Sequence, residues 1–190
     1  MNKQTFLSQF LLYQPDHHYS NKALKKTSNY KKSAILVSLV ERKNQLYVIL
    51  TVRAEHLHHH PGQISFPGGG FEADDITLTN TALRETKEEI GIDAKYIKVF
   101  ASLPKLITSS NYIVSPYLAF VDNKHKIKID TNEVQSTFEV PLDFLLNKNN
   151  IQEIPFMRHA KLGITYGIMY KNHFIWGFTA NIINAISAYF

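Results

Sequence analysis

Residues 66–92 read FPGGGFEADDITLTNTALRETKEEIGI, a glycine-rich turn followed by a stretch with the composition of an acidic helix. A helix advances about 100° per residue, so Glu85, Glu88 and Glu89 fall within one arc of about 100° and share a face. Like charges at this spacing destabilise a helix slightly when exposed, and more when partly buried. The sequence therefore predicts a neighbouring group that offsets the repulsion.

The spacing also predicts where this helix begins, ends and packs. We expect Asp74 or Asp75 to cap its start and Gly91 to end it. The carboxylates would then lie at the edge of the core, because the adjoining arc can pack on a sheet. That arc consists of Thr79, Ala82, Leu83, Thr86 and Ile90.

Two interpretations fit the helix taken alone. The carboxylate oxygens would hold a divalent cation such as Mg²⁺ or Mn²⁺, because these hard ions prefer oxygen ligands. Alternatively, the face is solvated and its acids pair locally with Arg84 and Lys87. The preceding glycines favour the metal, since they let a backbone carbonyl join the ligands and free amides hold a phosphate.

The whole chain has the composition of one folded domain, with or without a small extension. It has 190 residues, of which 44% are hydrophobic and 19% charged, and this excludes a disordered tail. The absence of cysteine excludes disulfides, thiolate metal sites and a cysteine nucleophile. The opening MNKQTFLSQFLLYQ reads as an amphipathic helix rather than a signal peptide, and no segment has the roughly 18 consecutive apolar residues of a membrane span. We therefore expect a cytoplasmic protein.

The formal net charge is +5, and lysines cluster in residues 21–33 and 123–130. Such patches attract polyanions through their summed field. A nucleic acid, an acidic membrane surface and a phosphorylated small molecule all meet this condition, and so do solvated lysines without a ligand. The charge alone leaves these alternatives open.

The apolar runs predict an α+β domain with a mixed or antiparallel sheet flanked by helices. Residues 33–40 and 45–53 have the pattern of a β-hairpin. Further strands are expected at 96–103, 112–121, 133–140 and in a pair around 162–176, and short helices from Pro141 and over 178–190.

Two other patterns contain residue types that occur in catalytic sites, but the sequence lacks the partner residues that such sites require. The histidines of HLHHH, residues 56–60, are adjacent in a loop, and the ligand spacing of a zinc enzyme does not follow them. Ser65, Ser109 and Ser110 have no nucleophile-elbow context, so a serine hydrolase is not expected.

The run from Gly69 to Ile92 resembles the signature box of the Nudix hydrolases. It shares the first glycine, the RE and EE pairs of RETKEE and the final GI. Counted from Gly69, the stretch is one residue longer than the usual box, so that Asp75 takes the place of the early glutamate. Thr86 replaces the usual aliphatic residue.

The longer spacing is similar to that of the coenzyme A pyrophosphatase branch of this family. That branch has a second signature upstream, an LLTxRS segment that leads through an arginine and a glycine to FPGG. Residues 49–69 read ILTVRAEHLHHHPGQISFPGG and match it in register, with Ala54 in place of the serine and His58 in place of the arginine. The stretches NEVQSTFEVPLDFLL and IWGFTANI also resemble the branch.

The resemblance implies a Nudix fold, a mixed β-sheet sandwiched between α-helices, over residues 33–190, with residues 1–32 as an N-terminal extension packed on it. It implies hydrolysis of the diphosphate bond of coenzyme A or an acyl derivative, which gives 4′-phosphopantetheine and adenosine 3′,5′-bisphosphate. Bound cations suit this chemistry, because they neutralise the phosphate oxygens and activate a water.

The implied site residues divide by role. The implied ligands of Mg²⁺ or Mn²⁺ are Glu85, Glu88, Glu89 and the carbonyl of Gly69, or that of Gly70 given the longer spacing. The implied catalytic residues are Glu88, Glu89 and Arg84, of which Arg84 would orient a carboxylate. The general base stays open between Glu88, Glu89 and Glu133.

The implied substrate contacts are Arg53, His58, Gly68 and Gly69. Arg53 ends a predicted strand beside the loop, and its planar guanidinium suits bidentate binding of phosphate. A structural ion pair is the alternative for Arg53.

The expected partner is a small-molecule nucleotide rather than a nucleic acid or a membrane, and a homodimer is compatible with the sequence. The nearest rival function is Nudix hydrolysis of another nucleoside diphosphate derivative, such as an ADP-sugar or a dinucleotide. A non-catalytic nucleotide-binding module is the rival of a different class. Such a module would lack a ligand carboxylate, and all three are present here.

Overall fold

The computed structural model describes residues 1–12, 29–108, 110–158 and 161–190. Part of the predicted N-terminal helix (Tyr13 and Gln14), Ser109 and most of the first lysine-rich stretch lie outside the described residues. Among the helices of the described part, none combines the length and the hydropathy that a bilayer span requires.

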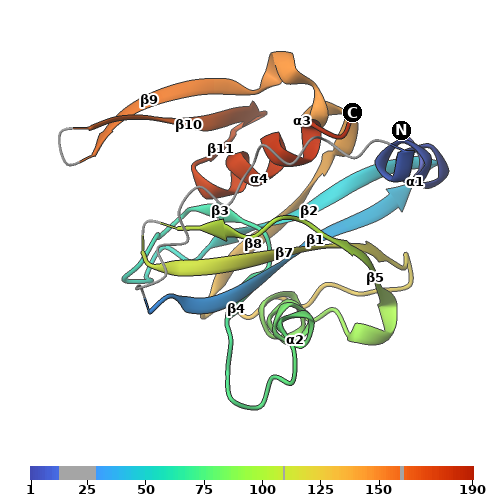
Figure 1. Ribbon diagram of the computed structural model, residues 1–190. Coiled ribbons are helices and arrows are strands. Elements are labelled where there is room, and N and C mark those ends of the chain that lie inside the picture. Colours follow the sequence, from blue (N-terminus) through green and yellow to red (C-terminus); the bar gives the residue numbers. More distant parts are fainter. Residues whose placement is uncertain (13–28, 109, 159–160) are drawn as a thin grey trace.

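The described residues form a mixed eight-stranded sheet, a three-stranded sheet and four α-helices, which confirms the α+β class (Figure 1). The main sheet consists of β1 (Lys31–Arg42), β2 (Gln45–Arg53), β3 (Ile64–Ser65), β4 (Gly68–Gly70), β5 (Ile97–Ser102), β6 (Leu106–Ile107), β7 (Tyr112–Val121) and β8 (Val134–Pro141). The second sheet consists of β9 (Gln152–Arg158), β10 (Lys161–Tyr170) and β11 (His173–Trp176). The helices are α1 (Lys3–Leu12), α2 (Leu78–Ile90), α3 (Leu142–Leu146) and α4 (Phe178–Ser187).

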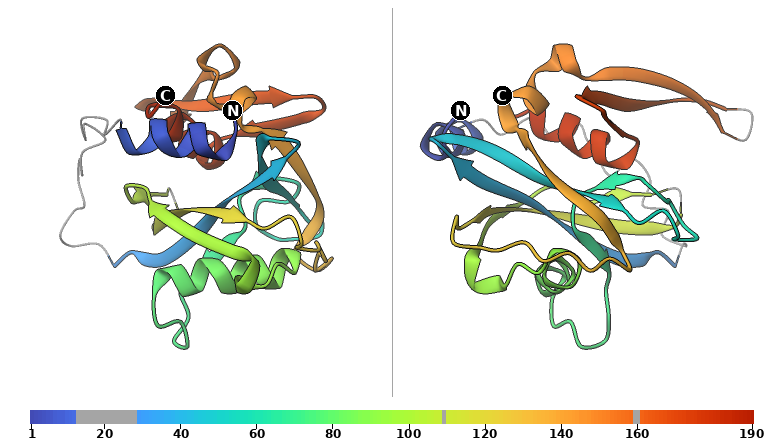
Figure 2. Two further views of the ribbon diagram at one scale, coloured as in Figure 1. Left: turned by 90° about the vertical axis from the view of Figure 1, so that its right-hand side faces the viewer. Right: turned by 180° about the vertical axis from the view of Figure 1, so that it is seen from behind.

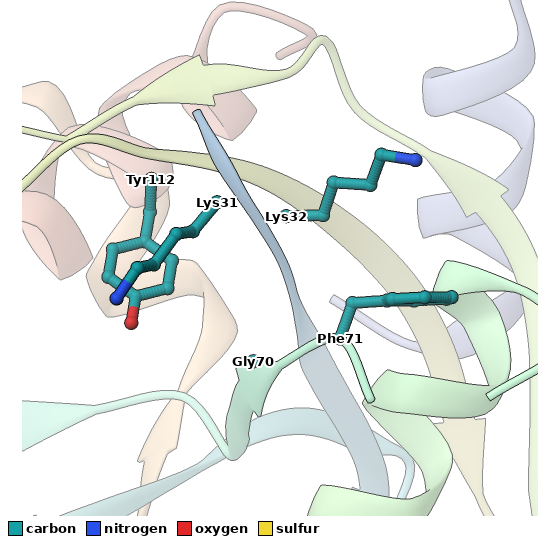
Figure 3. Close-up of a pocket in the computed structure, with 5 residues that line it drawn as sticks. All are labelled: Lys31, Lys32, Gly70, Phe71 and Tyr112. Atoms are coloured by element: carbon teal, nitrogen blue, oxygen red, sulfur yellow. The ribbon is translucent and has the colours of Figure 1, made fainter. Parts of the chain in front are cut away.

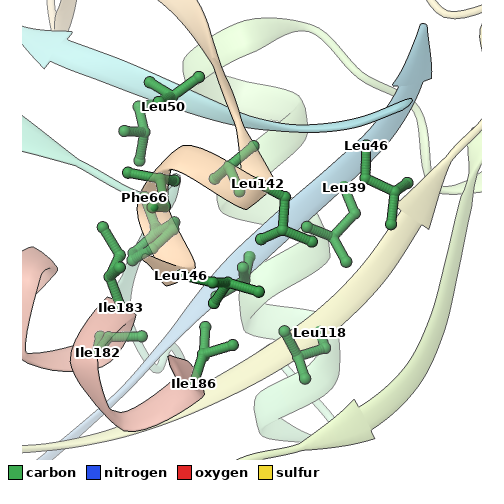
Figure 4. Close-up of a cluster of buried hydrophobic side chains, with 14 of the residues drawn as sticks. Leu39, Leu46, Leu50, Phe66, Leu118, Leu142, Leu146, Ile182, Ile183 and Ile186 are labelled. Atoms are coloured by element: carbon green, nitrogen blue, oxygen red, sulfur yellow. The ribbon is translucent and has the colours of Figure 1, made fainter. Parts of the chain in front are cut away.

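The main sheet is buried between helices on both faces. Helix α2 covers one face, and α1, α3, α4 and the second sheet lie on the opposite side (Figures 1 and 2). On the α2 side, Ala34 and Leu36 of β1 pack with Ala82 of the helix. On the other side a larger apolar cluster joins the sheet to α3 and α4 and includes Leu39 and Ile183 (Figure 4). The predicted sandwich is therefore confirmed.

The predicted hairpin is present as β1 and β2. These strands pair antiparallel and join through Lys43 and Asn44, whose φ angles are 48° and 65°. Two successive residues in the left-handed region are typical of a type I′ turn, whose twist matches that of the strands. Strand β1 also pairs in parallel with β7, which makes the sheet mixed.

Strand β4 holds the glycine-rich turn against the start of β1. The two strands pair antiparallel, with Gly69 opposite Ala34. A Cβ on Gly68 would lie 2.6 Å from the Cα of Ile35, which is a backbone atom and cannot move aside. Glycine at position 68 therefore permits the close approach. This pairing leaves β4 in contact with α2.

Helix α2 ends where the sequence predicts but starts differently. Gly91 ends it with φ 73°, in the left-handed conformation that glycine adopts without strain. The predicted cap at Asp74 or Asp75 is wrong, because the N-cap is Thr77, whose side chain accepts an amide hydrogen bond from the first turn. Asp75 does not cap the helix because its carboxylate is bonded to Arg84.

The C-terminal part contains one strand more than the sequence predicts. The pair expected around 162–176 is present as β10 and β11, but β9 precedes them and pairs antiparallel with β10. The helix predicted from Pro141 is α3, with Pro141 at its N-cap. The last helix ends at Ser187 rather than at residue 190.

Candidate active site

Three carboxylates meet beside the glycine-rich turn. Glu85 and Glu89 come from successive turns of α2, and Glu133 comes from the loop immediately before β8. One oxygen atom of each lies within 4.8 Å of the others. Like charges this close repel one another, so the group is suited to binding a cation.

The loop that carries Glu133 is bonded to the ends of α2 and β2. The amide of Asp130 donates to the carbonyl of Glu89 at 3.0 Å, and the amide of Ala54 donates to the carbonyl of Glu133 at 2.9 Å. The first bond satisfies a carbonyl that the helix end leaves without an intrahelical partner. Backbone hydrogen bonds therefore fix the position of Glu133 relative to α2.

Glu89 is the buried member of this group, with 3% of its surface exposed. Burial is the largest cause that raises the pKa of its carboxyl to about 8, and the charges of Glu85 and Glu133 act in the same direction. The charge of Arg53 and a backbone hydrogen bond from Gly68 oppose the rise. Oε2 of Glu89 has no hydrogen-bond partner among the described residues. Such an atom is rare in proteins and calls for a ligand.

Glu85 lies in contact with the glycine-rich turn. A Cβ on Gly69 would lie 2.6 Å from Oε2 of Glu85, so a larger residue at position 69 would displace the carboxylate. Burial raises the pKa of Glu85, while the adjacent Arg84 lowers it. The role of the Gly69 carbonyl as a metal ligand stays a prediction.

Arg84 connects the acidic helix to the turn. Its Nη1 donates to Oε1 of Glu85 at 3.0 Å and to Oε2 of Glu88 at 2.7 Å. Its Nε and Nη2 donate to the two carboxylate oxygens of Asp75 at 3.1 and 3.0 Å, and Nη2 also donates to the carbonyl of Gly70 at 2.9 Å. A fixed guanidinium with these partners restricts the rotamers of Glu85.

Asp75 is the buried partner of Arg84. The hydrogen bond from Arg84 is the largest cause that lowers the pKa of Asp75 to about 2, against the opposing effect of burial. The hydroxyl of Thr81 and the amide of Glu72 also donate to this carboxylate. Asp75 therefore stays ionised and holds the guanidinium in place.

Glu88 lies apart from the three carboxylates. Its side chain is 55% exposed and pairs with Arg84, one turn earlier on the helix. Glu85, with 13% exposure, and Glu89 face the turn, so the three glutamates of the helix do not have equivalent surroundings. The predicted roles of Glu88 as metal ligand and catalytic residue stay predictions.

Arg53 ends β2 on the face of the sheet that α2 covers. Side chains alternate along a strand, and Ile49, four residues earlier on β2, packs with Ile90 of α2. The charge of Arg53 lowers the pKa of Glu89. Within the described part of the chain its guanidinium makes no ion pair, unlike Arg42 and Arg84. The structural ion pair considered for Arg53 is thus not seen there.

The remaining predicted contacts lie in the loop after β2 and in the turn. His58 is exposed, and among the described residues its ring has no hydrogen-bond partner. The predicted substrate contacts of His58, Gly68 and Gly69 stay predictions. Glu133, by contrast, joins the acidic group, although the sequence named it only as a candidate base.

The donor atoms at this site fit a hard divalent cation. The group consists of carboxylate oxygens, which Mg²⁺ and Mn²⁺ accept as ligands. The unpartnered Oε2 of buried Glu89 supplies an independent reason to expect an ion there.

The NUDIX domain family model matches residues 29–160. The chain belongs to the Nudix family. Its relatives include the "Uncharacterized Nudix hydrolase NudL" of Yersinia pestis (strain Pestoides F) and that of Yersinia pseudotuberculosis (strain IP 31758). Each is 34% identical over 188 residues, which are 96% of this chain and 94% of the relative. As a Nudix hydrolase, the protein acts on nucleoside diphosphate derivatives with the help of divalent metal.

Solved structures resemble this Nudix protein in fold. A MutT/nudix family protein from Enterococcus faecalis has a TM-score of 0.53 at 16% identity, over 99% of this chain and 68% of its own. A C. elegans Ap4A hydrolase in a binary complex has a TM-score of 0.51 at 20% identity, over 58% of this chain and 80% of its own. At these identities the likeness concerns the Nudix fold alone.

Proposed function

We propose that the protein hydrolyses the diphosphate bond of coenzyme A or an acyl derivative, giving 4′-phosphopantetheine and adenosine 3′,5′-bisphosphate. The observation that carries the chemistry is the group of Glu85, Glu89 and Glu133, in which buried Glu89 has an oxygen without a partner among the described residues. The substrate class is supported by the upstream motif of residues 49–69, which includes Arg53.

The chemistry requires charge neutralisation at the diphosphate. Bound Mg²⁺ or Mn²⁺ would neutralise the phosphate oxygens and lower the pKa of the attacking water. Glu85, Glu89 and Glu133 would hold the ion, and Arg84 keeps Glu85 in position through its hydrogen bond at 3.0 Å. We retain Glu88 and the carbonyl of Gly69 as further candidate ligands.

The substrate would be gripped from the end of β2. The guanidinium of Arg53 is free of carboxylate partners in the described part of the chain and lies on the same face of the sheet as α2. It would bind a phosphate oxygen of the diphosphate, with His58 and the amides of Gly68 and Gly69 as additional contacts. One of three carboxylates, Glu88, Glu89 or Glu133, would accept the proton of the attacking water.

Four further proposals concern the whole protein: its N-terminal extension, its partner, its location and its oligomeric state. We propose residues 1–32 as an extension packed on the Nudix domain of residues 33–190, supported by Phe6 of α1, which is fully buried and stacks on Phe190 at a centroid distance of 5.1 Å. The proposed partner is a small-molecule nucleotide rather than a nucleic acid or a membrane. The proposed location of the protein is the cytoplasm. The homodimer that the sequence allows is checked by light scattering of the purified protein.

The test of the substrate is a product analysis. The purified protein is incubated with Mg²⁺ or Mn²⁺ and coenzyme A, acetyl-coenzyme A, ADP-ribose, NADH or diadenosine polyphosphates, and products are identified by mass. We expect 4′-phosphopantetheine or its acyl derivative as a product, and we expect the Glu89→Gln variant not to form it. Turnover of ADP-ribose or a dinucleotide with coenzyme A left intact would establish the rival substrate class instead. Binding without turnover of any compound would establish a non-catalytic module.

A further inference from the structure

The loop of residues 54–63 joins β2 to β3 and carries His58, a proposed substrate contact. Its base is closed by backbone hydrogen bonds to Arg53. The amide of Arg53 donates to the carbonyl of Gln63 at 3.0 Å, and the amide of Gly62 donates to the carbonyl of Arg53 at 3.2 Å. Because Gln63 directly precedes β3, the position of β3 determines whether both bonds can form.

A pocket beside the glycine-rich turn is the other basic surface in this region. It is lined by Lys31, Lys32, Gly70, Phe71 and Tyr112 (Figure 3). The two lysines are consecutive residues of β1, so their side chains point to opposite sides of the strand. Nζ of Lys31 lies 5.8 Å from the ring centroid of Tyr112. Nζ of Lys32 lies 5.7 Å from that of Phe71. The pocket therefore does not offer both ammonium groups to one phosphate, and Arg53 stays the candidate phosphate contact.

The first turn of α4 is bonded to β3. The hydroxyl of Thr179 donates to the carbonyl of Ile64 at 2.9 Å, although the two residues are 115 apart in the sequence. Both residues are buried. A Cβ on Gly177, the N-cap of α4, would lie 3.9 Å from Nε2 of Gln63. The start of the helix therefore contacts both β3 and the end of the loop.

Strand β3 has few other supports. It consists of two residues and pairs with β2 at Thr51 and Val52. The hydroxyl of Thr51 also donates to the carbonyl of Ser65 at 3.1 Å. Phe66, directly after β3, belongs to the same apolar cluster as Ile183 of α4 (Figure 4). A strand shorter than usual has few ladder bonds to fix it, so the contacts from α4 contribute to its position.

Helix α4 is itself anchored at a distance from the loop. The amide of Gly177 donates to the carbonyl of Tyr166 on β10 at 3.1 Å. The hydroxyl of Thr165, also on β10, donates to Oδ1 of Asn181 at 3.3 Å. Ile182 is fully buried in the apolar cluster between the helix and the main sheet. The helix can therefore act as a fixed support for β3.

We propose that Thr179 is a positioning residue for substrate binding. Its hydroxyl holds β3, and β3 holds the base of the loop against the backbone of Arg53. Thr179 thus acts on the substrate through Arg53 and does not touch it. The assignment rests on the proposed function in one respect, the contact between Arg53 and a phosphate oxygen of the substrate.

The first test measures the coupling between helix and loop without any substrate. Thr179→Val removes the donor, and Thr179→Ser retains it. Hydrogen exchange of the amides in residues 50–66, followed by mass spectrometry, should be about fivefold faster or more in Thr179→Val, because the loop base opens more often. The serine variant should exchange as the unmodified protein does. Thr165→Val is the matched control, since it removes another threonine bond to α4 without touching β3, and it should leave this exchange unchanged.

The second test follows the effect to the substrate. Thr179→Val should raise KM about fivefold with little change in kcat, because it disturbs binding and leaves the carboxylates in place. Thr179→Ser and Thr165→Val should leave KM unchanged. The double variant Thr179→Val/Arg53→Gln should have the KM of Arg53→Gln alone, since the first change acts through the second residue. If the valine variant does not fold, Thr179→Ala removes the same donor and gives the same readings.

Three results would overturn the proposal. The first is unchanged loop exchange in Thr179→Val. The second is faster exchange with unchanged KM, which would reduce Thr179 to a structural role. The third is a double variant whose KM is raised by the product of the two single effects.

The tests also separate this proposal from the proposed function. If coenzyme A is not hydrolysed, calorimetric titration with ADP in Mg²⁺ replaces the measurement of KM. An affinity for ADP that depends on Thr179 and Arg53 non-additively then supports the positioning role, while the proposed function fails. If coenzyme A is hydrolysed and Thr179→Val changes neither exchange nor KM, the proposed function holds and the positioning role fails.

Discussion

The amide nitrogen of Ala54 lies 2.9 Å from the carbonyl oxygen of Glu133, and this bond joins the end of β2 to the start of β8. It brings Glu133 to the same end of the sheet as Arg53. Glu85 and Glu89 of α2 face this end. Carboxylates from the helix and the loop therefore gather beside the guanidinium of Arg53, and among the described residues none of them forms an ion pair with it. The arrangement has the charges needed to bind an ion together with a diphosphate.

Removal of the Glu133 carboxylate tests its place in the metal site. Glu133→Gln should weaken Mn²⁺ binding about tenfold or more, because it removes one of three charged ligands. Calorimetric titration of the purified variant measures this directly. Glu153→Gln, an exposed glutamate on β9, serves as the matched control and should bind Mn²⁺ as the unmodified protein does. Identical affinities for the two variants would remove Glu133 from the site.

The buried Glu89 predicts how the stability of the metal-free protein depends on pH. Its pKa is raised from 4.5 to about 8, so between these values the folded state holds more protons than the unfolded chain. The free energy of unfolding should therefore fall as the pH rises from about 5 to 8. Urea denaturation in EDTA at several pH values measures this slope.

The substitution Glu89→Gln should remove most of that slope, because the amide does not ionise. At pH 8 it should also raise the free energy of unfolding of the metal-free protein by about 1–3 kcal/mol, by removing a buried charge. Added Mn²⁺ should stabilise the unmodified protein and not the variant. A pH dependence that persists unchanged in Glu89→Gln would show that another group is responsible.

The pairing of Asp75 with Arg84 makes a prediction at acid pH. Because the pKa of Asp75 is lowered from 3.8 to about 2, its stabilising contribution is complete above about pH 4 and is lost as the pH falls through 2. Asp75→Asn should lower the free energy of unfolding at pH 7 by about 1.5–3 kcal/mol, since it weakens the charge-assisted hydrogen bonds that Asp75 accepts from Arg84. Chemical denaturation provides the measurement. The exposed neighbour Asp74, changed to Asn, should have little effect.

The position of Arg53 predicts that its replacement weakens substrate binding. Arg53→Gln should raise KM for the diphosphate substrate about tenfold with a smaller change in kcat, because it removes charge-assisted hydrogen bonds to phosphate. Steady-state kinetics at saturating Mg²⁺ separate the two constants. Arg42→Gln, which breaks the ion pair with Glu139 at 2.7 Å elsewhere on the sheet, should leave KM unchanged. Equal values of KM for both variants would argue against a phosphate contact.

Local sequence patterns were sufficient for most of the fold. The two apolar runs of residues 33–40 and 45–53 predicted the β1–β2 hairpin, and Gly91 marked the end of α2. Strand β9 was missed because Pro155 argues against a central strand. It is tolerated since β9 lies at the edge of the second sheet, where it pairs with β10 on one side.

The site was predictable only in part, because tertiary pairing decides which acids meet. Helical spacing placed Glu85, Glu88 and Glu89 on one face and left open whether the acids bind metal or pair with Arg84. It did not separate Glu88, which is exposed and pairs with Arg84, from the two glutamates that meet Glu133. Asp75 has the chemistry of a helix cap, but its carboxylate instead accepts hydrogen bonds from Arg84, nine residues later, and from Thr81. Glu133 reaches the group through backbone bonds to α2 and β2, for which the sequence has no local signal.

The most direct test of the metal site is anomalous diffraction from crystals of the protein soaked in Mn²⁺. A peak should lie about 2.1 Å from carboxylate oxygens of Glu85, Glu89 and Glu133, the distance expected for a small divalent ion. The map would also show whether the carbonyl of Gly69 and Glu88 join the ligands. Absence of a peak among the three carboxylates at saturating Mn²⁺, or a peak held elsewhere, would contradict the assignment.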